Sequence, residues 1–80
     1  MNFVYILQSL VYPDKSYIGC TSDLKKRLSL HNSKKSPHTA KYAPWKLVSY
    51  VAVENKTKAY ELEKYLKSAS GRGFVLKRLL

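Results

Sequence analysis

The stretch Tyr17-Ile-Gly-Cys-Thr-Ser-Asp-Leu-Lys-Lys-Arg-Leu-Ser-Leu-His31 contains the change of pattern that decides the fold. Its first four residues are aromatic, β-branched or small, a composition that favours a short strand. Thr21, Ser22 and Asp23 follow, and each can cap a helix that we expect to run to about Asn32. The stretch therefore predicts a strand that leads directly into a helix.

The residues before this stretch predict a second strand and a tight turn. Phe3–Leu7 is aromatic, β-branched and apolar, as expected of a buried strand. Tyr12–Ser16 has turn chemistry, because Pro13 presets φ and the Asp14 side chain can bond to the nearby backbone. We therefore expect Phe3–Leu7 and Tyr17–Cys20 to form a β-hairpin.

The segment after the first helix predicts a loop and a third strand. Residues 33–44 are basic and contain two prolines, which is typical of a loop. Trp45–Val53 is apolar and rich in residues that favour β-structure, so we expect a strand there.

The remainder of the chain predicts two helices. Asn55 or Thr57 would cap a helix over residues 58–70, and Gly71 is placed to end it. The apolar residues of 74–80 are spaced like those of a short closing helix. The resulting order β-β-α-β-α-α predicts an α+β fold, in which helices flank a three-stranded, mostly antiparallel sheet.

Length and cysteine content limit the organisation of the chain. Eighty residues form a single domain, 1–80, without repeats or linkers. Cys20 is the only cysteine, so no disulfide can form within the chain, which favours a reducing compartment. The first ten residues lack the features of a signal peptide, and no stretch approaches the roughly 20 apolar residues of a membrane span. We therefore expect a cytoplasmic protein that is not inserted in a membrane.

The charge balance is the strongest feature of the composition. Fifteen Lys and Arg residues stand against five Asp and Glu residues, for a formal net charge of +10. A domain this basic attracts polyanions, and nucleic acid is the commonest such partner. A basic surface with no ligand, or association with ribosomes, is the alternative. The basic residues are spread over several segments, which disfavours a membrane-binding amphipathic helix.

Two polar side chains lie on or beside the apolar face of the first helix. Leu24 and Leu28 form this face, and at 100° per residue His31 falls close to Leu24. Arg27 lies at the edge of the same face, one turn before His31. A half-buried histidine and an arginine with a buried stem would explain each residue singly.

Glu63 has a comparable place on the second helix. It lies beside Ala59 and Leu66, which belong to the apolar stripe of that helix. An ion pair with Lys67, four residues on, is the simplest explanation and contributes about 0.2–0.5 kcal/mol to helix stability. Because the chain has only five Asp and Glu residues, a carboxylate in this place is nevertheless notable.

Tyr5 and Tyr17 lie on the two arms of the hairpin, and together with these polar residues they resemble the GIY-YIG nuclease family. The similarity is carried by Val4-Tyr5, Tyr17-Ile18-Gly19, Thr21, Asp23-Leu24, Arg27-Leu28, His31-Asn32, Pro44-Trp45-Lys46-Leu47-Val48, Ala59 and Glu63. It covers nearly the whole chain. It is greatest to small stand-alone bacterial members related to the nuclease domain of the excision-repair incision subunit, and Gly19 would be a structural glycine of the motif.

The resemblance implies an endonuclease that hydrolyses DNA with one divalent cation, Mg²⁺ or Mn²⁺. Glu63 would hold this cation, because it follows Ala59 at the family's spacing; Glu61 is the alternative. One carboxylate leaves most of the metal's ligand shell to water and phosphate oxygens. Arg27 would hold the phosphate through its guanidinium group.

The resemblance also implies that a tyrosine helps to deprotonate the attacking water. Tyr5 and Tyr17 are both candidates for this base. A free tyrosine titrates near pH 10, so the reaction requires a lowered pKa or help from His31. The choice between the two tyrosines stays open at the level of sequence.

Two residues depart from the family pattern. Phe3 replaces the first glycine, which mainly affects strand packing. Cys20 stands where the related repair domain has a lysine thought to assist catalysis, so its presence puts the rate in question.

The remaining basic residues are candidates for contacts with the nucleic-acid backbone. These residues are Lys25, Lys26, Lys34, Lys35, Lys41 and Arg72. Such contacts give affinity without sequence selectivity, so the resemblance implies selectivity for structure or only weak sequence selectivity. A nucleic-acid-binding module without catalysis is the alternative function, followed by an interaction module in a larger repair complex.

Overall fold

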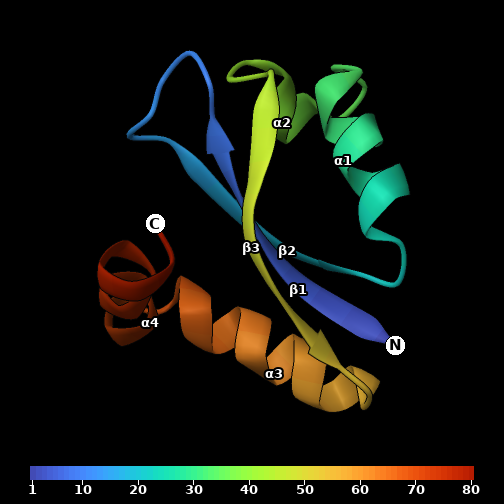
Figure 1. The fold of residues 1–80 in the computed structure, drawn as a ribbon, viewed down its shortest axis with the longest axis vertical. Coiled ribbons are helices and arrows are strands. Elements are labelled where there is room, and N and C mark those ends of the chain that lie inside the picture. The colour runs from blue at the N-terminus through green and yellow to red at the C-terminus, as the bar shows by residue number, and fades with distance from the viewer.

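The three strands of the computed structural model, which describes residues 1–80, form one antiparallel sheet in the order β2-β1-β3 (Figure 1). The elements in chain order are β1 (Asn2–Ser9), β2 (Ser16–Thr21), α1 (Leu24–Asn32), α2 (Pro37–Ala40), β3 (Trp45–Val53), α3 (Lys56–Lys67), α4 (Ala69–Phe74) and the π-helical turn η1 (Val75–Leu79). The expected α+β fold and the three expected strands are confirmed.

Helices cover both faces of the sheet, so the apolar residues divide into two cores. Figure 1 shows α1 and α2 on one side of the strands, with α3 and α4 on the other. The core under α1 contains Tyr5, Leu7 and Trp45. The core under α3 contains Val4, Ile6, Ile18, Ala59, Leu66 and Val75. Because β1 is the central strand and is covered on both faces, both of its alternating sets of side chains are buried.

Side-chain caps fix the beginnings of the two longer helices. Asp23 Oδ1 accepts a hydrogen bond from the Lys26 N–H at 3.0 Å, before the first turn of α1. Asn55 Oδ1 accepts one from the Lys58 N–H at 3.0 Å, before the first turn of α3. Of the two caps considered for α3, Asn55 is therefore the one present.

The expected end of the second helix was wrong. α3 ends at Lys67, and Ser68 adopts an extended conformation that separates it from α4. Gly71 lies inside α4 and does not end a helix. A Cβ atom at position 71 would overlap the Tyr65 carbonyl and lie 2.6 Å from Leu66 Cα. The glycine is needed because α4 packs directly onto the last turn of α3, not because a helix stops there.

The loop expected over residues 33–44 contains one short helix. α2 begins at Pro37, which suits the first turn of a helix because proline lacks a backbone donor. This turn brings Thr39 into the core, where it is almost fully buried. The two prolines made the segment resemble a loop, but the first of them begins a helix.

A buried chain of hydrogen bonds connects the sheet to α1 and α2. The Tyr5 hydroxyl lies 3.0 Å from His31 Nε2, and Thr39 Oγ1 lies 2.8 Å from His31 Nδ1. The Trp45 indole N–H donates to the Thr39 carbonyl at 2.9 Å. His31 is only 2% exposed, and both of its nitrogens are therefore satisfied within the protein.

The burial of His31 determines its charge. Burial lowers the pKa of the imidazole, and the nearby positive charge of Arg27 lowers it further. A neutral imidazole donates from one nitrogen and accepts at the other. The two hydrogen bonds are therefore coupled: if the Tyr5 hydroxyl donates, the Thr39 hydroxyl accepts, and the reverse.

Gly71 and Gly73 provide a matched test of the packing between α3 and α4. We expect Gly71→Ala to lower the free energy of unfolding by about 1–3 kcal/mol, the usual cost of overpacking. Gly73→Ala should leave stability unchanged or raise it by up to about 1 kcal/mol, because a Cβ at position 73 meets no atom within 4 Å and alanine favours helices. Thermal melts of both variants check this; equal melting temperatures would contradict the contact.

Acidification should destabilise the protein through His31. Above about pH 6.5 the imidazole is neutral in both states. As the pH falls below this value the unfolded chain takes up the proton first, since the folded-state pKa is lower, and stability declines until the folded-state pKa is reached. Melting temperatures from pH 7.5 to 5 should fall less steeply for His31→Gln than for the wild type. His38→Gln, at the exposed second histidine, should retain the wild-type slope.

Candidate functional site

Two tyrosines and a histidine meet on one face of the sheet, beside the edge strand β2. Tyr5 comes from the central strand, Tyr17 from β2 and His31 from the last turn of α1. The ring centroids of Tyr17 and His31 are 4.8 Å apart, and those of Tyr5 and Tyr17 are 6.2 Å apart. The α1 face predicted from periodicity therefore does turn His31 towards both tyrosines.

Gly19 makes this cluster possible. It pairs with Tyr5 across the hairpin. A Cβ atom at position 19 would overlap the Tyr5 hydroxyl and lie 3.0 Å from Tyr17 Cε2. Only glycine leaves space for the Tyr5 hydroxyl at this position, which explains physically why the motif has a glycine here.

Arg27 adds a positive charge at the same edge of the sheet. It lies one turn before His31 on α1 and is exposed, whereas His31 is buried. Burial lowers the pKa of His31, and the charge of Arg27 lowers it further. Burial raises the pKa of Tyr5 and Cys20, and the charge of Arg27 offsets part of that rise. The guanidinium group is thus close to the cluster and free to bind an anion from solvent.

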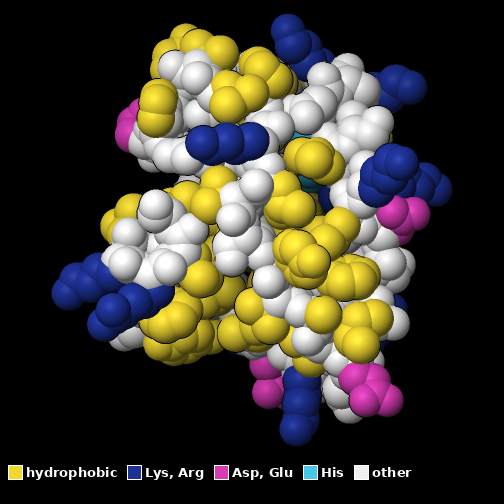
Figure 2. Space-filling view, viewed as in Figure 1, with side chains coloured by type: hydrophobic (Ala, Val, Ile, Leu, Met, Phe, Trp, Pro, Cys, Tyr) yellow, Lys and Arg dark blue, Asp and Glu magenta, His cyan; other side chains and the backbone are white.

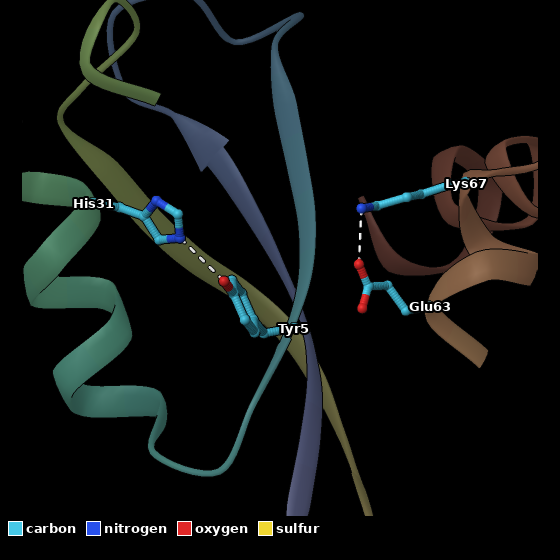
Figure 3. Close-up of polar contacts among 4 residues, drawn as sticks. All are labelled: Tyr5, His31, Glu63 and Lys67. Carbon is cyan, nitrogen blue, oxygen red and sulfur yellow. Dashed lines mark hydrogen bonds and ion pairs between the residues drawn. The ribbon is translucent and has the colours of Figure 1, made fainter. Parts of the chain in front are cut away.

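Glu63 approaches from the opposite face of the sheet. It lies on α3 and forms an ion pair with Lys67, with Lys67 Nζ 2.8 Å from Glu63 Oε2, as the four-residue spacing predicted. Its side chain is 20% exposed, against 47% for Lys67. Figure 3 shows the Tyr5–His31 and Glu63–Lys67 pairs with β2 running between them in that view.

The electrostatics connect the two halves of the site around β2. The negative charge of Glu63 raises the pKa of both Tyr5 and Cys20. Lys67 Nζ lies 5.9 Å from the centroid of the Tyr17 ring. The five residues predicted from sequence therefore surround one exposed edge strand. Tyr5, Tyr17 and His31 lie on one face of the sheet, Arg27 lies at the margin of that face, and Glu63 lies on the other face.

Burial distinguishes the two tyrosines. Desolvation raises the pKa of Tyr5 well above its usual range, and Tyr17, Glu63 and Cys20 raise it further. Its hydroxyl is also engaged by His31. Tyr17 is only half-buried. Tyr5 therefore remains a neutral hydroxyl, and Tyr17 is the tyrosine that solvent or a substrate can reach.

The site contains one carboxylate and not a preformed metal cage. No group of three or more His, Cys, Asp or Glu side chains is close enough to hold a metal ion. Glu61, the alternative ligand, is exposed and outside the ion pair. Cys20 is half-buried near Glu63, and burial is the main reason that its thiol pKa is raised.

Basic side chains surround the site, and two grooves lie at opposite ends of β2. Figure 2 shows Lys and Arg distributed around one face of the molecule, with fewer acidic side chains among them. A groove of about 570 Å³ runs along the whole of α1, from Thr21 to Lys35, and contains Lys26, Arg27 and Lys35. Arg72 lies in a second groove, of about 430 Å³, at the beginning of β2.

The other three basic candidates lie outside these grooves. Lys25 and Lys34 are exposed near the two ends of α1, and Lys41 Nζ is 5.5 Å from the centroid of the Tyr42 ring. The structure therefore places only half of the six basic candidates, Lys26, Lys35 and Arg72, in a groove beside the site.

Sequence reasoning missed two residues of this region. Thr39 orients His31, but a threonine in a basic, proline-containing segment carries no signal for such a contact. Lys67 was expected only as the ion-pair partner of Glu63. Its position over Tyr17 could not be predicted, because it depends on how α3 packs against β2.

Comparisons with known proteins identify the family of the chain. Residues 1–77 match the family model described as the GIY-YIG catalytic domain. The chain is 41% identical over 69 residues to the UPF0213 protein CPE1444 of Clostridium perfringens, which covers 84% of this chain and 71% of that protein. It is 43% identical over 67 residues to the UPF0213 protein YsiG of Lactococcus lactis, which covers 81% of this chain and 62% of that protein.

A solved structure has a similar fold. The solution structure of the UPF0213 protein BH0048 from Bacillus halodurans has a TM-score of 0.56 and 30% sequence identity, over 96% of this chain and 84% of that one. The family match supports a nuclease-type function and implies a nucleic-acid substrate. No helix is long and apolar enough to cross a membrane. With the motif residues gathered around β2 and the match extending over nearly all of its length, the chain belongs to the GIY-YIG family.

Proposed function

We propose that this chain is a divalent-metal-dependent endonuclease that hydrolyses phosphodiester bonds in DNA, with structure selectivity or only weak sequence selectivity. The observation that carries the proposal is the arrangement of Tyr17, Arg27 and Glu63 around one exposed edge strand. A base, a phosphate ligand and a metal ligand are the groups that such hydrolysis requires. The net charge of +10 supplies attraction for the polyanionic substrate.

The residues present fit one hard divalent cation at Glu63. Mg²⁺ is commonly held by one or two carboxylates and keeps several water ligands, so a single, partly exposed glutamate is sufficient. A cation held there would supply positive charge that stabilises the phosphate and the leaving 3′ oxygen. Lys67 must release the carboxylate first, which costs little because exposed pairs of this spacing contribute only about 0.3–0.5 kcal/mol.

The other residues of the site bind the phosphate, accept the proton or position the base. Arg27 binds the phosphate oxygens, because its guanidinium is exposed beside the cluster. Tyr17, as the phenolate, accepts the proton of the attacking water, since it is the accessible tyrosine. Lys67 places a positive charge near the Tyr17 ring, whereas Cys20 carries none. Tyr5 and His31 hold Tyr17 in place through ring contacts.

A nucleic-acid-binding module without catalysis is the second candidate function. The observation that favours it is the Glu63–Lys67 pair, which already neutralises the proposed metal ligand. Cys20 at the position of a lysine in the related repair domain favours it as well. The two candidate functions differ in the role of Glu63. The endonuclease requires Glu63 for cleavage, whereas the binding module does not require it.

Glu63 and Glu61 provide the test of the metal ligand. Plasmid, nicked and branched DNA are incubated with each variant in Mg²⁺ and in EDTA. We expect Glu63→Gln to lose cleavage and Glu61→Gln, two residues away and exposed, to retain it. EDTA should abolish cleavage by the wild type. Cleavage that persists in both EDTA and Glu63→Gln would refute the metal mechanism, and binding without any cleavage would favour the module.

Tyr17 and Tyr5 provide the test of the base. We expect Tyr17→Phe to slow cleavage by about 10²–10⁴-fold, the usual contribution of a general base, with little change in melting temperature. Tyr5→Phe should instead lower the free energy of unfolding by about 1–3 kcal/mol, because it leaves a buried His31 nitrogen without its partner. Single-turnover cleavage rates and thermal melts separate the two effects; the opposite pattern would assign the base to Tyr5.

A further inference from the structure

The groove at the beginning of β2 differs in character from the groove along α1. Five of its ten lining residues are hydrophobic, against one of nine in the α1 groove. Leu76 and Leu80 of the C-terminal segment line it and are 68% and 41% exposed. Its volume, about 430 Å³, lies within the usual range of small-ligand sites. One groove is thus polar and basic, and the other has an apolar wall.

Positive charge surrounds this apolar wall. Lys15, Lys67 and Arg72 line the groove together with a single acidic residue, Asp14. The Arg72 Nε–H donates to the Lys67 carbonyl at 3.1 Å, which holds the arginine against the end of α3. An apolar surface with cationic margins is suited to a ligand that has an aromatic part and a phosphate part.

The groove is continuous with the candidate site. Tyr17 and Lys67 line the groove, and the same two residues lie beside the proposed hydrolytic centre. Tyr17 is half-buried: its ring packs on His31, and the same residue lines the groove. A nucleotide in the groove would therefore lie beside Tyr17, with the phosphate bound by Arg27 farther along β2.

We propose that this groove, formed by Tyr17, Leu76, Leu80 and Arg72, binds an unpaired nucleotide on the Tyr17 side of the proposed hydrolytic centre. The inference rests on the proposed nuclease function, which places a phosphodiester at β2. A base in a duplex is paired and stacked inside the helix and cannot contact the apolar wall, whereas an unpaired base stacks readily on aromatic and apolar side chains. The favoured substrate is then a single strand, overhang or flap at this end of β2, with the sugar–phosphate backbone lying along the polar α1 groove at the other end.

The test compares two DNA probes that differ only in their bases. Each is a hairpin duplex with a three-nucleotide single-stranded extension; one extension carries bases and the other is abasic, so the number of phosphates is equal. Binding is measured by fluorescence anisotropy in EDTA, and a gel verifies that the DNA stays intact. We expect the wild type to bind the base-bearing probe at least about fivefold more tightly, as stacking of one base implies.

Variants assign the preference to the groove. Leu76→Asp should abolish the preference for bases while the protein stays folded, because Leu76 is mostly exposed. Val11→Asp, an equal change at an exposed residue outside both grooves, should keep it. Leu80→Asp provides a second groove variant if Leu76→Asp does not fold.

The outcomes separate this inference from the nuclease function. A preference for bases in the wild type that both groove variants lose supports the inference even if no cleavage is ever observed. Equal binding of the two probes, or a preference that Leu76→Asp and Leu80→Asp retain, overturns it even if the protein cleaves DNA. A wild-type dimer that Leu76→Asp converts to a monomer, with equal binding of the probes, would instead assign the groove to a second copy of the chain.

Discussion

The hydrogen bond between the Tyr5 hydroxyl and His31 joins the central strand to the first helix, and the geometry of the site depends on it. A buried imidazole must keep partners on both nitrogens, so Tyr5 and Thr39 together fix the rotation of α1 against the sheet. Once α1 is fixed, Arg27, one turn earlier, is directed to solvent beside β2. Gly19 is constrained by the same hydroxyl, since any larger residue would displace it.

The position of β2 at the edge of the sheet explains why residues from both faces can act together. A central strand would separate Tyr17 and Glu63 by a neighbouring strand on each side. At an edge, side chains from the two faces can meet around the strand, as Lys67 and Tyr17 do. An exposed edge strand can also pair with a strand of another protein molecule. Here basic side chains in the adjoining grooves increase the electrostatic repulsion between copies of the chain.

Much of this arrangement was predictable because it follows from local composition and spacing. Residue composition and turn chemistry predicted the hairpin that carries Tyr5 and Tyr17. Helical spacing placed His31 on the face towards the sheet, and the four-residue interval predicted the Glu63–Lys67 pair. What could not be predicted depends on contacts between distant segments. Gly71 was predicted to end a helix. In the folded chain a glycine is needed there because the Tyr65 carbonyl leaves no space for a Cβ atom. The distinction between Tyr5 and Tyr17 required their burial, which the pattern of a hairpin does not contain.

The division of the apolar residues into two cores has a consequence for how the site is assembled. Tyr5 and Tyr17 belong to one core, to which His31 is hydrogen-bonded, whereas Glu63 and Lys67 belong to the helix that covers the other. A domain can open locally at a lower free energy than it unfolds globally, for example by detachment of α3 and α4 from the sheet. Such an opening would remove the carboxylate while the tyrosines and histidine stayed in place. In the proposed mechanism, hydrolysis at β2 therefore requires both halves of the molecule to be folded at once. A partly folded chain would keep its net charge of +10 but would lack the proposed metal ligand.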